Sequence, residues 1–231
     1  PVLQPFERCR PEETGVSSVR IREFLQTVRD DPTINMHSII ILKDRKIITE
    51  AAFGANRTDI AKLMFSASKS VVSLLFGILV GEGKATVDEK LIDIFSDKTT
   101  PITKLQIGEL TVKDVLTMRS GIIFNEAVSM VTEDWVRGYL SSPVQGKIGE
   151  SFNYNSMNTY MLVAIIDRKC GVGFEKYLET KLFEPLGITG TYWEKSPAGL
   201  PKGGWGLYMK PEDMAKLGQM VMDGGVWKGR R

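Results

Sequence analysis

Ser66 and Lys69 lie three residues apart at the start of a long apolar run, and their side-chain types can act together in catalysis. Residues three positions apart on a helix share one face, so the serine hydroxyl and the lysine amine would meet. A serine hydroxyl is a poor nucleophile until a base removes its proton. A lysine amine can be that base where burial or a neighbouring charge lowers its pKa. The pair therefore indicates a nucleophile and its base.

The same spacing is also compatible with a structural role. A chain of 231 residues with this serine and lysine content contains about one such pair by chance. Ser66 or Ser68 would then cap a helix, and Lys69 would extend its ammonium group into solvent. Spacing alone leaves both interpretations open.

The residues that follow the pair predict the element that positions it. The run from Val71 to Val80 is apolar almost all round, so we expect a buried helix through the centre of the protein. Gly81 and Gly83 are expected to end this helix. Ser66 would then lie at its N-terminal end, where a cleft can open.

The rest of the chain predicts strands first and helices afterwards. The β-rich runs 38–43 and 47–53, joined by a polar turn, predict a hairpin. Apolar spacing, caps and breakers predict further helices over 17–30, after the capping box at Thr111, near 133–140, from 156 to Gly171, over 174–182, and from Pro211 to Gly224. This order favours an α+β domain with a helical insertion.

Composition argues against several classes of function. Thirty basic and 28 acidic residues leave a net charge of +2 without a long run of like charges, so we expect neither nucleic acid nor an anionic membrane as partner. The longest apolar stretch is too short to span a bilayer. Cys9 and Cys170 are expected to be unpaired thiols. The single histidine, His37, cannot build a zinc site alone, so we expect no metal and no other cofactor. The cellular compartment stays open.

Several segments follow one another in the order of a single enzyme family. FSASKS (65–70) is similar to its nucleophile motif, and FNYNSMNTYMLVAII (152–166) to its tyrosine motif and the following helix. Further similar segments are GEGKATVDEKLIDIF (81–95), LTVKDVLTMRSGI (110–122), LFEPLGI (182–188) and GGWGLYMKPEDMAKLGQM (203–220). The chain thus resembles the serine β-lactamase and penicillin-binding-protein superfamily, in particular its class C-like branch of β-lactamase-related serine hydrolases. Because the motifs are collinear, they favour the catalytic interpretation of Ser66.

The resemblance implies both a fold and a catalytic set. The fold is α+β and serine β-lactamase-like, with flanking helices on an antiparallel sheet and a helical subdomain. The implied catalytic residues are Ser66, Lys69 and Tyr154. Beside a lysine ammonium the tyrosine anion is favoured, so Tyr154 would act as general base toward Ser66 or toward the deacylating water. The amide of Ser66 at the helix N-terminus would be one oxyanion donor.

One motif departs from the family pattern. Where many relatives have Tyr-x-Asn, this chain has Tyr154, Asn155 and Ser156, so a hydroxyl replaces the amide that contacts a substrate's acylamino group. We expect Asn155 and Ser156 to bind substrate. Because family members with small residues at this position hydrolyse esters or amides, the resemblance does not single out β-lactams.

The third motif of the resembled family lies further downstream than Arg231. We therefore expect an N-terminal fragment, that is, one incomplete domain over 1–231 from which the C-terminal strands and the second oxyanion donor are missing. Its expected segments are an N-terminal helix and hairpin (17–65), the nucleophile helix with the helical subdomain (66–200), and the start of the C-terminal α/β part (201–231). Such a fragment would expose an unpaired sheet edge open to association and would be inactive by itself.

Taken with the motifs, these features predict a serine hydrolase that forms an acyl-enzyme with a small-molecule ester, amide or β-lactam. Two alternatives stay open. One is a non-catalytic penicillin-binding or sensor module of the same fold, and the other is a D-alanyl-D-alanine peptidase.

Overall fold

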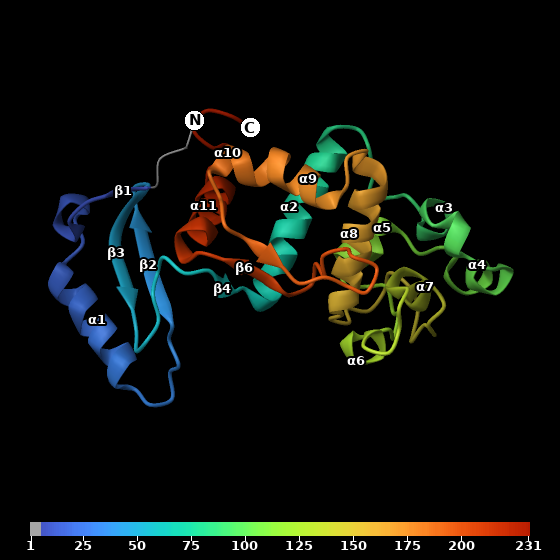
Figure 1. Cartoon of the computed structure of the whole chain (residues 1–231), viewed down its shortest axis with the longest axis horizontal. Helices are drawn as coiled ribbons and strands as arrows, with labels where there is room; N and C mark the ends of the chain where they lie inside the picture. Colours follow the sequence, from blue (N-terminus) through green and yellow to red (C-terminus); the bar gives the residue numbers. More distant parts are fainter. Residues whose placement is uncertain (1–5) are drawn as a thin grey trace. The chain divides into compact units, whose positions relative to one another are not determined.

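The computed structural model describes residues 6–231 (Figure 1). Its internal contacts divide the chain into two compact units. The sheet unit contains the described residues up to Lys62 together with Phe183–Thr191 and Tyr208–Arg231. The helical unit contains Leu63–Leu182 and Tyr192–Leu207, and all three predicted catalytic residues belong to it.

Both strands and helices are present, which confirms the α+β class. The strands are β1 (Glu7–Arg8), β2 (Ser38–Lys43), β3 (Lys46–Ala52), β4 (Lys62–Leu63), β5 (Tyr192–Trp193) and β6 (Leu207–Met209). The α-helices are α1 (Ser18–Asp30), α2 (Ser68–Gly81), α3 (Leu91–Ile94), α4 (Pro101–Ile107), α5 (Val112–Leu116), α6 (Glu126–Ser129), α7 (Trp135–Leu140), α8 (Ser156–Cys170), α9 (Phe174–Leu178), α10 (Glu184–Leu186) and α11 (Pro211–Met222). There are 3₁₀ turns at Pro11–Thr14, Phe65–Ala67 and Ser96–Lys98, and a π-helical turn at Glu179–Phe183.

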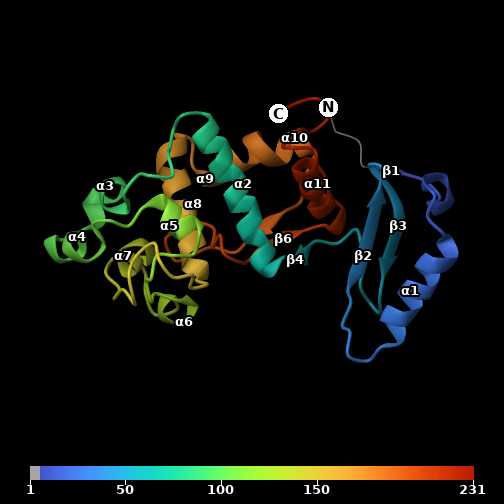
Figure 2. The same ribbon diagram turned by 180° about the vertical axis from the view of Figure 1, so that it is seen from behind.

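The sheet unit is built on the predicted hairpin, which the structure confirms. β2 and β3 pair antiparallel from Ser38 opposite Ala52, and β1 adds a parallel strand on the other side of β3. The connecting residues Asp44 and Arg45 both have positive φ, as a tight two-residue hairpin turn requires. Within this unit α11 packs against β2, and α1 runs beside the strands (Figure 1 and Figure 2).

Helix α8 forms the centre of the helical unit. Helices α2, α5, α7 and α9 all pack against it, and each of its residues from Ser156 to Ile166 is buried. Gly171, in the left-handed conformation, ends the helix as predicted. The start of α8 is therefore held on several sides, which matters because Tyr154 directly precedes it.

Helix α2 is less completely buried than its sequence predicts. One face packs inward through Val71, Val72, Leu75, Phe76 and Leu79. The opposite face leaves Ser70, Ser73 and Gly77 exposed. The expectation of a helix without a solvent-facing stripe was wrong, because the stripe consists of small residues that scarcely interrupt an apolar run. The element buried on all sides is α8.

Helices α4 and α6 were not among the helices predicted from the sequence. Thr100 caps α4 by accepting a hydrogen bond from Thr103 N, and Pro101 opens it. Asn125 caps α6 in the same manner. The capping box at Thr111, predicted from sequence, is confirmed, since Thr111 and Asp114 bond reciprocally.

Every helix within residues 6–231 is too short or too polar to cross a lipid bilayer. The two cysteines are free, as expected.

Candidate active site

Ser66 lies in the 3₁₀ turn that leads into α2 and is exposed. The residue before it, Phe65, has a φ of 45°, a region that bulky side chains rarely occupy and that costs about 1–3 kcal/mol. The hydroxyl of Ser68 donates to the Phe65 carbonyl oxygen at 2.6 Å and helps to hold this turn. Ser68 is itself fully buried, so its hydroxyl serves the turn and Ser66 is the serine that a substrate can reach.

Lys69 joins three segments of the helical unit through its ammonium group. Its Nζ donates to Ser66 Oγ at 3.1 Å, to Ser156 Oγ at 3.0 Å and to the carbonyl oxygen of Gly204 at 2.6 Å. An ammonium group has three protons, so these partners occupy its whole donor capacity. The serine and lysine therefore meet as their spacing predicts, and the lysine is not extended into solvent.

Tyr154 is the second residue whose side chain contacts the Ser66 hydroxyl. Its hydroxyl donates to Ser66 Oγ at 2.7 Å, and Lys69 Nζ lies 4.8 Å from the centre of its ring. Burial raises the pKa of Tyr154, but the neighbouring Lys69 ammonium and the hydrogen bond with Ser66 outweigh this effect. The pKa of Tyr154 consequently lies below the usual 10.0 of a phenol.

Two other tyrosines of the helical unit show the opposite shift. Burial raises the pKa of Tyr139, which is completely enclosed, and burial also raises the pKa of Tyr160. Among residues 6–231, no lysine or arginine beside either hydroxyl lowers its pKa. Tyr154 therefore differs from both in environment, and the difference favours it as a proton acceptor.

The two residues expected to bind substrate have different surroundings. Asn155 is buried; it caps α8 by accepting from Met157 N at 2.9 Å, and its amide nitrogen donates to the carbonyl oxygens of Ile122 and Phe124. Its side chain thus fastens the 122–124 segment to the start of α8. Ser156 instead turns its hydroxyl toward Lys69 and accepts the hydrogen bond described above.

Gly204 belongs to this assembly although the sequence did not single it out. Its carbonyl oxygen receives the shortest of the Lys69 hydrogen bonds. A Cβ atom at this position would lie 2.5 Å from Ser156 O and 2.8 Å from Ser156 Cβ, so the backbone approach requires glycine. The consecutive glycines 203 and 204, within a segment already matched to the family, were the available signal.

A buried amide holds the framework behind Tyr154. Asn158 Oδ1 accepts from Tyr139 Oη at 2.8 Å and from Ser120 Oγ at 3.0 Å. The backbone N–H of Asn153 donates to Met118 O at 2.8 Å, two residues before Ser120. This network connects α7, α8 and the 118–121 turn to the residue preceding Tyr154. The sequence did not single out Asn158 or Tyr139.

A cavity of about 360 Å³ opens beside Ser66. Its lining combines aromatic and other apolar side chains with three serines and two charged groups: Phe65, Ser66, Glu126, Ser129, Met130, Trp135, Ser156, Lys202 and Trp205. The rings of Trp135 and Trp205 stack with centroids 6.1 Å apart and form one wall. A compound bound here would lie against Ser66.

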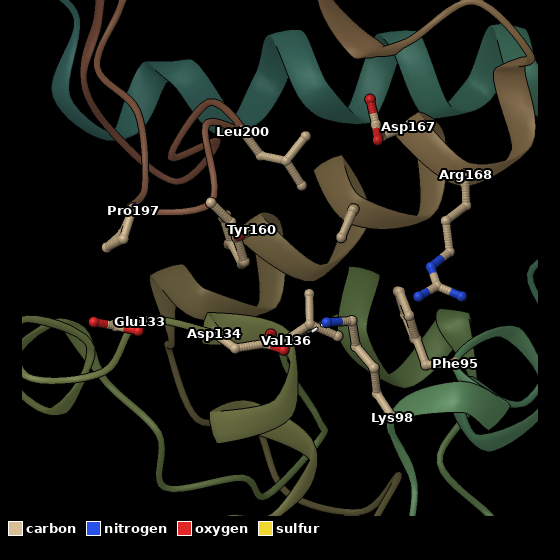
Figure 3. A pocket seen from close by; sticks show the side chains of 12 residues that line it. Phe95, Lys98, Glu133, Asp134, Val136, Tyr160, Asp167, Arg168, Pro197 and Leu200 are labelled. Atoms are coloured by element: carbon tan, nitrogen blue, oxygen red, sulfur yellow. Dashed lines mark hydrogen bonds and ion pairs between the residues drawn. The ribbon is translucent and has the colours of Figure 1, made fainter.

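A larger cavity of about 600 Å³ is shown in Figure 3. Tyr160 lines it, and the Tyr160 and Trp135 rings are in edge contact at 4.9 Å. Arg168 in its wall makes a two-fold hydrogen bond with Asp97, and Lys98 pairs with Asp134. Ser66, Lys69 and Tyr154 do not line this larger cavity.

The assembly provides the groups that acyl transfer needs, namely an accessible hydroxyl, an ammonium group and a phenol of lowered pKa in mutual contact. No group of three or more His, Cys, Asp or Glu side chains within residues 6–231 is placed to hold a metal ion.

Comparison with known proteins identifies proteins similar to most of the chain. The chain is 26% identical over 226 residues to the 6-aminohexanoate-dimer hydrolase of Paenarthrobacter ureafaciens. This alignment covers 84% of this chain and 54% of the hydrolase. FmtA from Staphylococcus aureus superposes with a TM-score of 0.75 at 19% identity, over 99% of this chain and 71% of that one. The D-amino acid amidase from Ochrobactrum anthropi SV3 superposes with a TM-score of 0.70 at 17% identity, over 89% and 72% of the two chains.

The chain spans about half the length of the curated relatives that it matches. The similar structures are less than 25% identical and establish the serine β-lactamase-like fold. The sequence profile of the beta-lactamase family matches residues 22–229, which is nearly all of the chain. The chain therefore belongs to the beta-lactamase family.

Proposed function

We propose that the protein is a serine hydrolase that cleaves esters or amides through an acyl-enzyme on Ser66. The observation that carries the proposal is the double contact at Ser66 Oγ, 3.1 Å from Lys69 Nζ and 2.7 Å from Tyr154 Oη. Both distances are within the range over which a proton is transferred. The nucleophile therefore has two proton-carrying neighbours and an open cavity beside it.

In the acylation step, Ser66 Oγ attacks the carbonyl carbon of the substrate and loses its proton to the Tyr154 phenolate. The lowered pKa of Tyr154 makes this phenolate more accessible than that of an ordinary tyrosine. The carbonyl oxygen gains negative charge, which the Ser66 N–H at the start of α2 would help to hold. Tyr154 then returns the proton to the leaving alcohol or amine as the C–O or C–N bond breaks.

The deacylation step repeats this sequence with water. Tyr154 takes a proton from the water, whose oxygen attacks the acyl carbon, and the Ser66 oxygen leaves and recovers the proton. Lys69 keeps its positive charge beside both oxygens throughout. It stabilises the phenolate and is itself held by Ser156 and Gly204.

Esters and simple amides are the substrates that the site favours. A hydroxyl at Ser156 occupies the position where many relatives carry an asparagine amide, and it is engaged with Lys69. The names of two relatives, an aminohexanoate-dimer hydrolase and a D-amino acid amidase, support hydrolysis of amide-type substrates. A test of substrate class should compare esters and simple amides with the two alternative substrates, β-lactams and D-alanyl-D-alanine peptides.

Covalent labelling of the whole protein with a fluorophosphonate tests the proposal. Intact-mass analysis should find one adduct in the wild type and in Ser70→Ala, because Ser70 is exposed and its hydroxyl is not among the hydrogen-bond partners of Lys69 Nζ, which are Ser66, Ser156 and Gly204. The Ser66→Ala variant should carry none. An adduct on Ser66→Ala contradicts the assignment of the nucleophile.

The fate of an acyl group distinguishes an enzyme from a sensor. A p-nitrophenyl ester should acylate Ser66 and be released in repeated turnovers that disappear in Ser66→Ala. A stable acyl-protein without turnover would show instead a penicillin-binding or sensor module.

A further inference from the structure

The cavity beside Ser66 carries a carboxylate that the proposed mechanism does not use. Glu126, the first residue of α6, lines this cavity with Ser66. Among residues 6–231 its carboxylate forms no ion pair with a lysine or arginine. Glu126 is also exposed, so a ligand can reach it.

The second charged residue of the lining is already neutralised. Lys202 Nζ lies 2.8 Å from Glu194 Oε2 and 5.4 Å from the centre of the Trp205 ring. Lys69 does not line the cavity, because its ammonium is turned toward Ser66, Ser156 and Gly204. Of the two charged side chains that line the cavity, the one without an ion-pair partner among residues 6–231 is therefore the Glu126 carboxylate, whereas the Lys69 ammonium lies behind Ser66 and Ser156. The Glu126 carboxylate repels an anionic ligand and attracts a cationic one.

The walls of the cavity favour the same kind of ligand. The stacked rings of Trp135 and Trp205, together with Phe65, present aromatic surface, and aromatic faces attract an ammonium group within about 6 Å. The volume of about 360 Å³ lies near the lower end of the range of about 300–1,000 Å³ usual for ligand pockets. A compound about the size of an amino acid amide fits these conditions.

We propose that the Ser66 cavity selects esters and amides that carry a free ammonium group near the scissile carbonyl, and that Glu126 is the partner of this ammonium. The inference rests on the proposed serine hydrolase function and names the substrate class of that same site. An ammonium beside Glu126 has a second consequence. The Glu126 charge raises the pKa of Tyr154, so a cation that offsets this charge favours the phenolate.

Protection of Ser66 against fluorophosphonate labelling tests the inference without requiring turnover. The competitors are alaninamide and N-acetylalaninamide, each as both enantiomers, at pH 6.5, where an α-amine with a pKa of about 8 is protonated. In the wild type, alaninamide should protect at a concentration at least about 10-fold lower than the acetylated compound, as expected for a hydrogen bond to a charged group. The Glu126→Gln variant should abolish this difference. Glu133→Gln, which removes an exposed carboxylate outside this cavity, should preserve it.

Three results overturn the inference while the serine hydrolase proposal survives. They are equal protection by the two amides in the wild type, an unchanged difference in Glu126→Gln, and stronger protection by the anionic compound succinamate, which would assign recognition to Lys202. If Ser66 is not labelled at all, the proposed function fails first and the inference fails with it. The two proposals are thus distinguished by the labelling of Ser66 in the absence of competitor.

Discussion

The Tyr154 hydroxyl donates a hydrogen bond to Ser66 Oγ over 2.7 Å, although the two residues are 88 positions apart in the chain. Ser66 is positioned by the turn before α2, and Tyr154 by the segment that leads into α8. Because α2 and α8 pack against each other, the two helix N-terminal regions bring the hydroxyls together. The same packing places Lys69 within reach of both residues.

Removal of the phenol in Tyr154→Phe should lower kcat/KM by about 10²- to 10⁴-fold, the usual contribution of a general base. The pH profile gives the sharper readout. The phenolate is the active base, so its fraction and the rate increase with pH up to the pKa of Tyr154, which lies below the ordinary 10.0. In Tyr154→Phe this rising limb should disappear. Ester hydrolysis measured between pH 6 and 10 shows whether it does.

Tyr160→Phe is the matched control for this prediction. Burial raises the pKa of Tyr160, so it stays protonated over the same pH range and cannot supply the rising limb. The control variant should keep the wild-type profile. A limb that survives in Tyr154→Phe would assign the titration to another group.

Replacing Lys69 by arginine should slow the labelling of Ser66 by at least about 10²-fold while the positive charge is kept. The three acceptors of Lys69, namely Ser66, Ser156 and Gly204, surround a tetrahedral ammonium, and a planar guanidinium cannot reproduce these three bonds. Thermal unfolding of the variant is the necessary companion measurement. Labelling at the wild-type rate, with an unchanged thermal midpoint, would show that only the charge at this position matters.

Gly204→Ala should disrupt the site through a steric contact with Ser156. The added Cβ would approach Ser156 O to 2.5 Å, so either Ser156 or the Gly204 carbonyl has to move away from Lys69. Overpacking of this kind costs about 1–3 kcal/mol. Gly77→Ala is the control, because a Cβ on this residue of α2 meets no atom within 4 Å and alanine is the better helix former.

The free energy of unfolding of the two glycine variants, measured in urea, gives the comparison. Gly204→Ala should lose stability and labelling rate together, whereas Gly77→Ala should be neutral or slightly more stable. Equal behaviour of the two variants would show that the close approach at Gly204 is of no consequence.

The elements around the site were largely predictable because each carries a local signal. The hairpin from Ser38 has alternating β-rich runs and a polar turn, and the helix before Gly171 has an apolar pattern with a glycine stop. The pairing of Ser66 with Lys69 follows from helix geometry alone. The class C-like assignment and the expected association through a sheet edge stay predictions.

The residues that the sequence did not reveal act through contacts between distant segments. Gly204 lies 135 positions after Lys69 in the chain, and only its backbone oxygen accepts the hydrogen bond from Lys69. The side-chain pattern of the sequence therefore cannot predict this contact. Ser73 and Gly77 are too small to mark the exposed stripe of α2 in an apolar run. The buried amide of Asn158 has the same appearance in the sequence as a surface polar residue of an amphipathic helix. Only the packing of the folded chain shows whether such a residue is buried or exposed.

Asn158 is expected to be the most sensitive of the residues behind the site. In Asn158→Leu the hydroxyls of Tyr139 and Ser120 lose their shared acceptor inside the core. A buried polar group without a partner costs about 1–3 kcal/mol, so the variant should be destabilised by at least that amount. Tyr139→Phe removes one hydrogen-bond donor, but Asn158 keeps its hydrogen bond with Ser120. This variant should therefore lose less free energy of unfolding than Asn158→Leu. The double variant should cost less than the sum of the two single variants, because the Tyr139 hydroxyl is then no longer left unpaired.

Urea denaturation of the four proteins of this cycle, with Ser66 labelling as a parallel readout, tests the network. Asn153 N donates to Met118 O beside the Ser120 turn, so loosening that turn should also slow labelling by displacing the neighbouring Tyr154. Strict additivity of the two substitutions would show that Tyr139 and Asn158 stabilise the core independently. Loss of stability without any change in labelling would confine the network to the core and separate it from the position of Tyr154.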